Sequence, residues 1–154
     1  MAAPLPKRPA FISSIVYKDT RAALEWLQKA FGFESSEVLT DSRGTIVHAE
    51  MSHGDGVIMV GSEFADWARS PASVSGKNTQ RVHVRIERDI DQHCVRARAA
   101  GATIALQPAD QFYGERTYIA VDLEGHHWTF SQTVAHVSKE EMEKASGFKF
   151  KSLS

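Results

Sequence analysis

Apolar and polar residues follow two different spacings along the chain, and each spacing predicts a type of element. Strict alternation predicts strands, and apolar residues that recur three and four positions apart predict helices. The second pattern is clearest where Leu24, Leu27 and Phe31 fall on one side of a helix. In chain order we predict strand 10–17, helix 19–32, strands 33–39, 45–51 and 56–61, strand 81–87, helix 89–101, and strands 102–107, 115–122 and 126–132.

Capping residues bound these helices. Asp19 or Thr20 can accept the first free amides of the first helix, and Gly32 supplies the left-handed backbone that ends it. The second helix is expected to begin at a capping box and to end at a glycine, and a third helix is also expected to begin at a capping box. The residues in these roles are Asp89, Gln92 and Gly101 for the second helix, and Ser138 and Glu141 for the third.

The order strand, helix, strand, strand, strand therefore occurs twice, which indicates a tandem duplication. We predict an α+β fold in one domain, residues 1–154. Its parts are module one at 10–62, a polar linker at 63–79, module two at 80–133, and a C-terminal helix and tail at 134–154.

Composition removes several classes of function. The 154 residues carry 18 basic and 19 acidic side chains in mixed order, so no basic surface for nucleic acid is expected. The longest apolar run, 57–60, is too short for a membrane span. A single cysteine, Cys94, fits a reducing compartment, and we expect a cytoplasmic protein in which Cys94 is a small core residue.

Alternation also assigns residues to the two faces of each sheet. In strand 45–51, Val47, Ala49 and Met51 form the apolar face, which leaves Ile46, His48 and Glu50 on the other. In module two the expected core residues are Val82, Val84, Ile86, Trp128 and Phe130. Their opposite faces show Arg81, His83, Arg85 and Glu87 on one strand, and His127, Thr129 and Ser131 on another.

If the polar faces curl together, they line one cavity for a small molecule. The predicted lining is His48, Glu50, Arg81, His83, Arg116, Tyr118, His127 and Thr129, with Tyr113 nearby. The alternative is that these faces are simply exposed to water, as in many one-sided antiparallel sheets.

The segment "YGERTYIAVDLEGHHWTFSQ", residues 113–132, combines candidate ligands and proton carriers with a tight turn. We interpret 122–126 as a hairpin turn in which Gly125 takes a positive φ and His126 orders the turn. Tyr113, Arg116 and His127 remain candidates for binding.

Three segments resemble one known family. They are "YKDTRAALEWLQKAFGFE", "HAEMSHGDGVIMVG" and the segment 113–132, which holds a D-x-x-G-H-x-W-x-F pattern. Together they are similar to the vicinal oxygen chelate superfamily, and within it to glyoxalase/bleomycin-resistance-like proteins of the PhnB-like branch. The resemblance implies two βαβββ modules in an incomplete eight-stranded, cup-shaped barrel, a homodimer, and a divalent metal in the enzymes of the family.

The positions that hold the metal in this family carry other residues here. They fall on Ile12, on the run 57–60 that contains no acid, on Arg81 or Val82, and on Thr129 where a glutamate is usual. These side chains do not form a metal site, so we expect neither the usual metal nor another cofactor. A substitute site from His48, Glu50, His83 and His127 remains an alternative.

Two classes of function stay open. The first is a metal-free protein that binds a small molecule, as the bleomycin-resistance branch does. The second is a glyoxalase-type lyase or isomerase that uses a substitute metal, or Glu50 as general base with His48 or His83 as acid. In the second class Arg81 or Arg116 would hold an anionic substrate.

Overall fold

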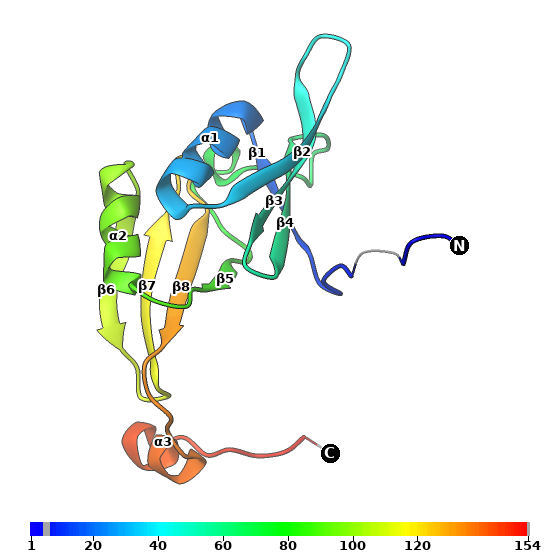
Figure 1. Cartoon of the computed structure of the whole chain (residues 1–154). Helices are drawn as coiled ribbons and strands as arrows, with labels where there is room; N and C mark the ends of the chain where they lie inside the picture. The colour runs from blue at the N-terminus through cyan, green and yellow to red at the C-terminus, as the bar shows by residue number, and fades with distance from the viewer. Residues whose placement is uncertain (5–6, 154) are drawn as a thin grey trace. The chain divides into compact units, whose positions relative to one another are not determined.

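The computed structural model describes residues 1–4 and 7–153 and contains the predicted elements in the predicted order (Figure 1). Residues 5 and 6, and Ser154 of the predicted tail, lie outside the described residues. The elements are β1 (Ser13–Tyr17), α1 (Thr20–Phe31), β2 (Glu34–Thr40), β3 (Ile46–His53), β4 (Gly56–Ser62), η1 (Pro71–Ser73), β5 (Val82–Arg85), α2 (Ile90–Ala99), β6 (Thr103–Asp110), β7 (Glu115–Val121), β8 (His127–Thr133) and α3 (Lys139–Ser146).

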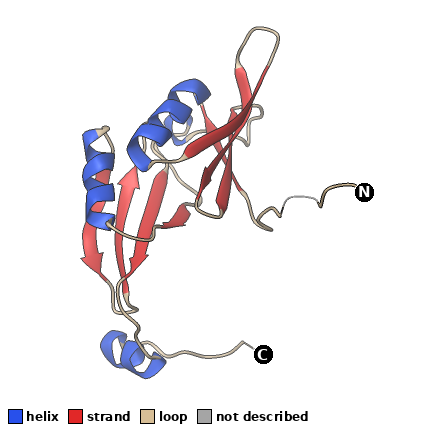
Figure 2. Ribbon diagram, viewed as in Figure 1, coloured by secondary structure: helices blue, strands red, loops and turns tan. Residues whose placement is uncertain are grey.

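The chain divides into two units, each built on a four-stranded mixed sheet (Figure 2). Unit 1 contains residues 1–78 together with 123–126, and unit 2 contains 79–122 with the chain from 127 onward. The strand orders are β1-β4-β3-β2 and β5-β8-β7-β6, and in each sheet the first pair is parallel while the others are antiparallel. The predicted α+β class and the two βαβββ repeats are confirmed.

In unit 1 the apolar stripe of α1 is buried and its ends are capped as predicted. The Asp19 side chain accepts from the amide of Ala22 at 3.0 Å, and Gly32 has φ +75°. Burying such a stripe, at about 25 cal/mol per Å² of apolar surface, is what stabilises a short helix. The buried apolar residues of α1 and its sheet include Ile15, Tyr17, Ala23, Leu24, Leu27, Ala30, Phe31, Ala49, Met51 and Val60.

The predicted alternation of β3 is wrong at its first two residues. Ile46 is buried and Val47 is exposed, the reverse of the expectation. The pairing with β2 shifts register between the partners of His48 and Ile46. A bulge of this kind places an extra residue in one strand and reverses the facing of whatever precedes it.

In unit 2, Trp128 and Phe130 are fully buried, as predicted, and Cys94 lies in the core. Burial raises the pKa of the Cys94 thiol, which disfavours the nucleophilic thiolate. The predicted capping box of α2 is wrong, because Asp89 has φ +59° and its side chain makes no cap bond. The carboxamide oxygen of Gln132, in β8, accepts from the Ile90 amide at 3.0 Å instead.

The predicted third helix is confirmed, including its capping box between Ser138 and Glu141. No residue of α3 is buried. Within the part of the chain that the structure describes, no helix has the length and apolar content to cross a membrane.

Candidate functional site

The polar face of the unit 2 sheet brings together side chains from three adjacent strands, β5, β8 and β7. His83 in β5 lies beside Thr129 in β8, which lies beside Ile119 in β7. One step along, Arg85 lies beside Ser131. Residues paired in this way across strands point to the same side of a sheet. The structure therefore gathers an imidazole, a guanidinium and two hydroxyls on one face.

Hydrogen bonds hold two of these groups in place. The Nε2 atom of His83 lies 2.7 Å from the Ser131 hydroxyl, and Arg85 Nη2 donates to the Thr133 hydroxyl at 2.7 Å. Ser131 is fully buried although it lies on this face. His83 is thus oriented by a fixed partner, and its second ring nitrogen remains for other contacts.

Thr129 is the exception on this face. It is 7% exposed, and its Oγ1 atom is buried without a hydrogen-bond partner among the described residues. A buried hydroxyl left in that state costs about 1–3 kcal/mol, so proteins rarely retain one without a use. A ligand oxygen or nitrogen would recover this energy once the neighbouring side chains moved aside and let it reach Oγ1.

Two predicted cavity residues lie on the other face. Tyr118 pairs with Phe130, is fully buried, and its hydroxyl lies 2.6 Å from His93 Nδ1 in α2. Arg116 forms ion pairs with Asp91 and Asp110, both at 3.0 Å. Both residues face α2, because they occupy the same register of β7 as the core position Ala120. Their expected place in the lining is corrected accordingly.

The other unit 2 candidates are spread more widely. His127 opens β8 on the same face as Thr129, paired with Val121. Arg81 is exposed just before β5. Tyr113 lies in the turn between β6 and β7, with its ring against Phe112 at a centroid distance of 5.1 Å. The same face of the unit 2 sheet therefore carries His83, His127 and Thr129. Tyr113 lies in the turn before β7, at a distance from them along the strand.

In unit 1, His48 and Glu50 share one face of β3, as predicted, but Glu50 is already paired. Arg8 Nη2 donates to its carboxylate at 2.7 Å. This hydrogen bond is the main reason that the pKa of Glu50 lies below its usual value, with burial opposing it. The lowered pKa makes Glu50 a weaker base. The N-terminal position of Arg8 gave no sequence signal for this contact.

The register of the strands shows which side chains lie beside one another near the metal positions that the family resemblance implies. In unit 1 the register aligns Ser14 with Met59 and Glu50, and Glu50 is held by Arg8. In unit 2 His83 lies beside Thr129, and a neutral threonine hydroxyl is a poor ligand for a divalent cation. Among the residues described, no group of three or more His, Cys, Asp or Glu side chains could hold a metal ion.

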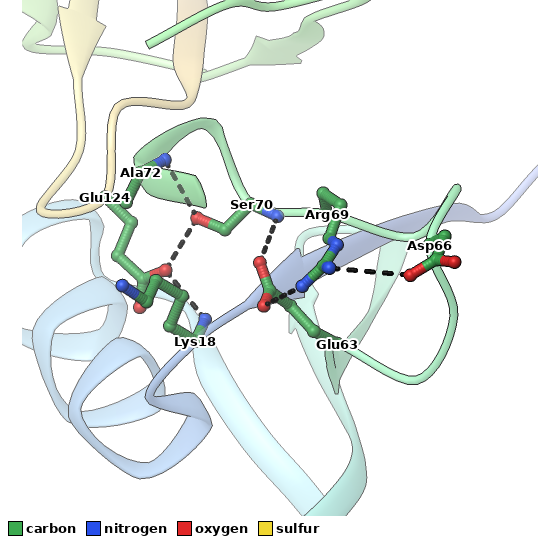
Figure 3. Close-up of polar contacts among 7 residues, drawn as sticks. All are labelled: Lys18, Glu63, Asp66, Arg69, Ser70, Ala72 and Glu124. Atoms are coloured by element: carbon green, nitrogen blue, oxygen red, sulfur yellow. Dashed lines mark hydrogen bonds and ion pairs between the residues drawn. The ribbon is translucent and has the colours of Figure 1, made fainter. Parts of the chain in front are cut away.

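The turn at 122–126 has a structural role, and Glu124 is its centre (Figure 3). The Glu124 carboxylate accepts from the backbone amides of Lys18 and Asp19 at 2.7 and 3.0 Å, and from the Ser70 hydroxyl at 2.6 Å. Ser70 is fully buried. One side chain thus joins the hairpin tip, the start of α1 and the segment that follows β4.

A second carboxylate extends this network. Glu63 accepts from the Ser70 amide at 2.9 Å and from Arg69 at 3.1 Å, and Arg69 also contacts Asp66 at 3.6 Å (Figure 3). A side-chain hydrogen bond with Ser73 is the largest of the causes that lower the pKa of Glu63. Part of the predicted linker is therefore tightly bonded.

The remaining residues of the turn confirm its interpretation. Gly125 has φ +96°, and its carbonyl accepts from Asn78 at 2.9 Å. His126 Nε2 lies 2.8 Å from the Val16 carbonyl, and its ring meets Tyr17 edge to face. Asp122 accepts from the Trp128 indole at 3.0 Å. The acidic residues and His126 of this segment are engaged in fixing the hairpin.

Comparison with known proteins places the chain in a family. Residues 10–130 match the model of the Glyoxalase/Bleomycin resistance protein/Dioxygenase superfamily. The Mycobacterium tuberculosis protein Rv0887c is 27% identical over 141 residues, 89% of this chain and 82% of that protein.

Solved structures agree with this match. TioX from Micromonospora sp. ML1 is 32% identical, with a TM-score of 0.65, over 84% of this chain and all of TioX. The fosfomycin resistance protein FosX from Listeria monocytogenes shares the fold at 17% identity and a TM-score of 0.59, over 92% of this chain and 99% of FosX. The chain belongs to the Glyoxalase/Bleomycin resistance protein/Dioxygenase superfamily, also known as the vicinal oxygen chelate superfamily.

Proposed function

We propose that the protein binds a small molecule on the polar face of the unit 2 sheet, without the metal that enzymes of its family use. The observation that carries this proposal is the buried Thr129 hydroxyl, which has no partner among the described residues. Beside it, His83 is fixed by Ser131 at 2.7 Å. A few oriented polar groups among apolar side chains are the usual composition of a ligand site.

The chemistry of this face indicates the kind of group that it would bind. His83, Thr129 and Arg85 can all donate hydrogen bonds. Ile119 and Val121, on the same face of β7, add apolar surface. The ligand we infer has an apolar body and an acceptor oxygen, such as a carbonyl or an acidic group, that meets Thr129.

The test is a ligand screen followed by titration. A panel of apolar carbonyl and acidic compounds is screened by thermal shift, with fosfomycin included because FosX is a fosfomycin resistance protein. Hits are measured by calorimetry against Thr129→Val and His83→Ala. We expect each variant to weaken binding at least about tenfold, the effect of losing one well-made hydrogen bond to a buried partner.

Thr40→Val is the matched control, since Thr40 is an exposed strand residue of the other sheet. Its affinity should equal that of the wild type. Hits that bind Thr129→Val as tightly as the wild type would refute the site. If the bound compound is recovered chemically unchanged, the protein binds it without turnover. If the compound is converted and the conversion is lost in Glu50→Gln, an acid/base enzyme is favoured instead.

We also infer that the protein belongs to the PhnB-like branch, forms a homodimer and acts in the cytoplasm. The branch is supported by the three sequence segments quoted above, and the dimer by the common occurrence of dimers in this superfamily. The cytoplasm is supported by the single cysteine, which is kept as a buried thiol. Sedimentation velocity at several concentrations tests the dimer directly.

A further inference from the structure

Strand β5 places basic side chains beside a row of hydroxyls on its neighbour β8. His83 and Arg85 occupy alternate positions of β5, and Thr129, Ser131 and Thr133 occupy alternate positions of β8. The register pairs His83 with Thr129 and Arg85 with Ser131. We call these five residues the β5–β8 row.

Each basic side chain of the row reaches past the residue with which it is paired. His83 lies beside Thr129, yet its Nε2 atom is 2.7 Å from the Ser131 hydroxyl. Arg85 lies beside Ser131, yet its Nη2 atom donates to the Thr133 hydroxyl at 2.7 Å. Because both side chains lean in the same direction, Ser131 and Thr133 have partners. Thr129, at the other end, is left without one among the described residues.

Arg85 carries a charge that has no carboxylate partner in the part of the chain that the structure describes. It donates to a neutral hydroxyl, whereas Arg8, Arg69 and Arg116 each contact a carboxylate at 2.7 to 3.1 Å. A guanidinium presents several N–H donors in one plane, and Thr133 takes only one of them. Arg85 can therefore still bind two oxygens of one anionic group.

Exposure by itself would explain an arginine without a counterion, because water solvates its charge. It does not explain Thr129, which is 7% exposed and whose hydroxyl is hidden from water without a partner in the described chain. Thr129 and Arg85 lie on adjacent strands, two positions apart in the register. With about 3.3 Å per residue and about 4.8 Å between strands, their Cα atoms are about 8 Å apart. One small molecule can therefore reach both.

We propose that the ligand of this face is an organic anion, whose negative group is bound by Arg85 while a second acceptor atom meets Thr129. The inference rests on the small-molecule site proposed above and specifies the charge of its ligand. Two acidic residues lie near the other end of the row. Glu115 is paired with Thr133, and Glu87 follows Arg85 by two positions. Both carboxylates repel an anion, so the negative group meets Arg85 from the side of Thr129.

The strands beyond β8 supply apolar surface for the rest of the ligand. Ile119 in β7 is paired with Thr129, and Leu106 in β6 is paired with Ile119. Leu106 is 60% exposed, so this surface is open. Positive charge therefore lies at the β5 end of the sheet and apolar surface toward β6. A carboxylate or phosphonate attached to an apolar body fits this order.

The test uses four probes that share one aromatic ring. Benzoate and phenylphosphonate supply the two kinds of oxyanion, benzamide a neutral group and benzamidine a positive one. Heteronuclear NMR titration measures their affinities and locates binding through the amides of β5 and β8. We expect the better of the two anions to bind at least about tenfold more tightly than benzamide, and less tightly as salt is added. Benzamidine should not bind, and the preferred anion identifies the oxyanion as carboxylate or phosphonate.

Arg85→Gln removes the charge while retaining much of the side-chain length. It should weaken the preferred anion about tenfold or more and leave benzamide unchanged. Arg21→Gln is the matched control, since Arg21 is an exposed arginine of α1 in unit 1, and it should change neither affinity. Far-UV circular dichroism confirms that both variants are folded, which is expected because both side chains are exposed.

The unfavourable outcomes separate the charge of the ligand from the site itself. If benzamide binds as tightly as the anions and is weakened by Thr129→Val, the site stands and the anionic ligand is refuted. The anionic ligand is also refuted if Arg85→Gln binds the anions as tightly as the wild type, or if the shifted amides lie outside β5 and β8. If none of the four probes binds at millimolar concentration, the anion proposal fails, and the ligand screen described above still decides the site at Thr129.

Discussion

Replacing Thr129 with valine should make the protein more stable and a poorer binder at once. Valine has nearly the same shape as threonine and suits a strand, so packing is retained. The hydroxyl that disappears is buried without a partner among the described residues, and such a group costs about 1–3 kcal/mol. We expect a gain in the free energy of unfolding of about 1 kcal/mol, or about 2–4 °C in melting temperature for a domain of this size.

Thr20 provides the matched control. It is also a buried threonine, at 4% exposure, but its hydroxyl lies 2.8 Å from the Ser62 hydroxyl. Thr20→Val should therefore lower the free energy of unfolding by about 1 kcal/mol, the value of one net hydrogen bond. Urea unfolding followed by circular dichroism measures both. If Thr129→Val destabilises the protein as much as Thr20→Val does, the Thr129 hydroxyl is satisfied and the reasoning for the ligand site fails.

Three further substitutions test other parts of the structure. Glu124→Ala removes three hydrogen bonds to a charged acceptor and should cost about 2–4 kcal/mol in urea unfolding, whereas Glu87→Ala, at an exposed position, should change stability by less than about 0.5 kcal/mol. Tyr118→Phe should cost about 1 kcal/mol through loss of the His93 bond, and the exposed Tyr113→Phe almost nothing; equal melting temperatures would contradict this. Hydrogen bonds from the Phe150 amide and Lys149 keep the pKa of Glu143 below its usual value, so the stability that Glu143 contributes is present above the ordinary glutamate pKa and is lost as the pH falls through the lowered value. The protection of the Phe150 amide from exchange, relative to an unstructured peptide at the same pH, should therefore fall in acid, and in Glu143→Gln it should be low at neutral pH too.

The sequence predicted those features that neighbouring residues determine. The Asp19 cap, the left-handed Gly32 and the alternation that buries Trp128 and Phe130 all depend on contacts within a few positions or on strand periodicity. The same local rules failed for α2, where Gln132 from another strand takes the place of the expected Asp89 cap. They also failed at Ile46, because alternation assumes an unbroken ladder and the bulge in β3 is not visible in residue types.

Only one property of the candidate site could be predicted from the sequence, namely which side chains point to the same face of a strand. The alternation of residues along β8, which the sequence shows directly, puts Thr129 and Ser131 on one face. The pairing of β5 with β8 adds His83 to that face. Arg116 and Tyr118 were misplaced because their polar atoms suggested an open face, whereas each has a specific partner from α2. A polar atom buried with a partner has the same sequence signature as one exposed in a site, so only the contacts could separate them.

Residues 122–130, which carry the family pattern, contain many polar side chains because each of several buried or backbone groups nearby needs a hydrogen-bond partner. Asp122, Glu124 and His126 each satisfy a specific donor or acceptor, and Glu124 and His126 bond to backbone groups near β1 and the start of α1. Backbone amides and carbonyls that lack a partner in a helix or sheet need one elsewhere, and these two side chains supply it. The polar residues of the pattern therefore fix the hairpin and the backbone of unit 1 around its tip. Thr129 lies in the middle of β8, and its hydroxyl forms no such bond among the described residues. Stabilisation of the hairpin therefore does not explain why a threonine occupies this position.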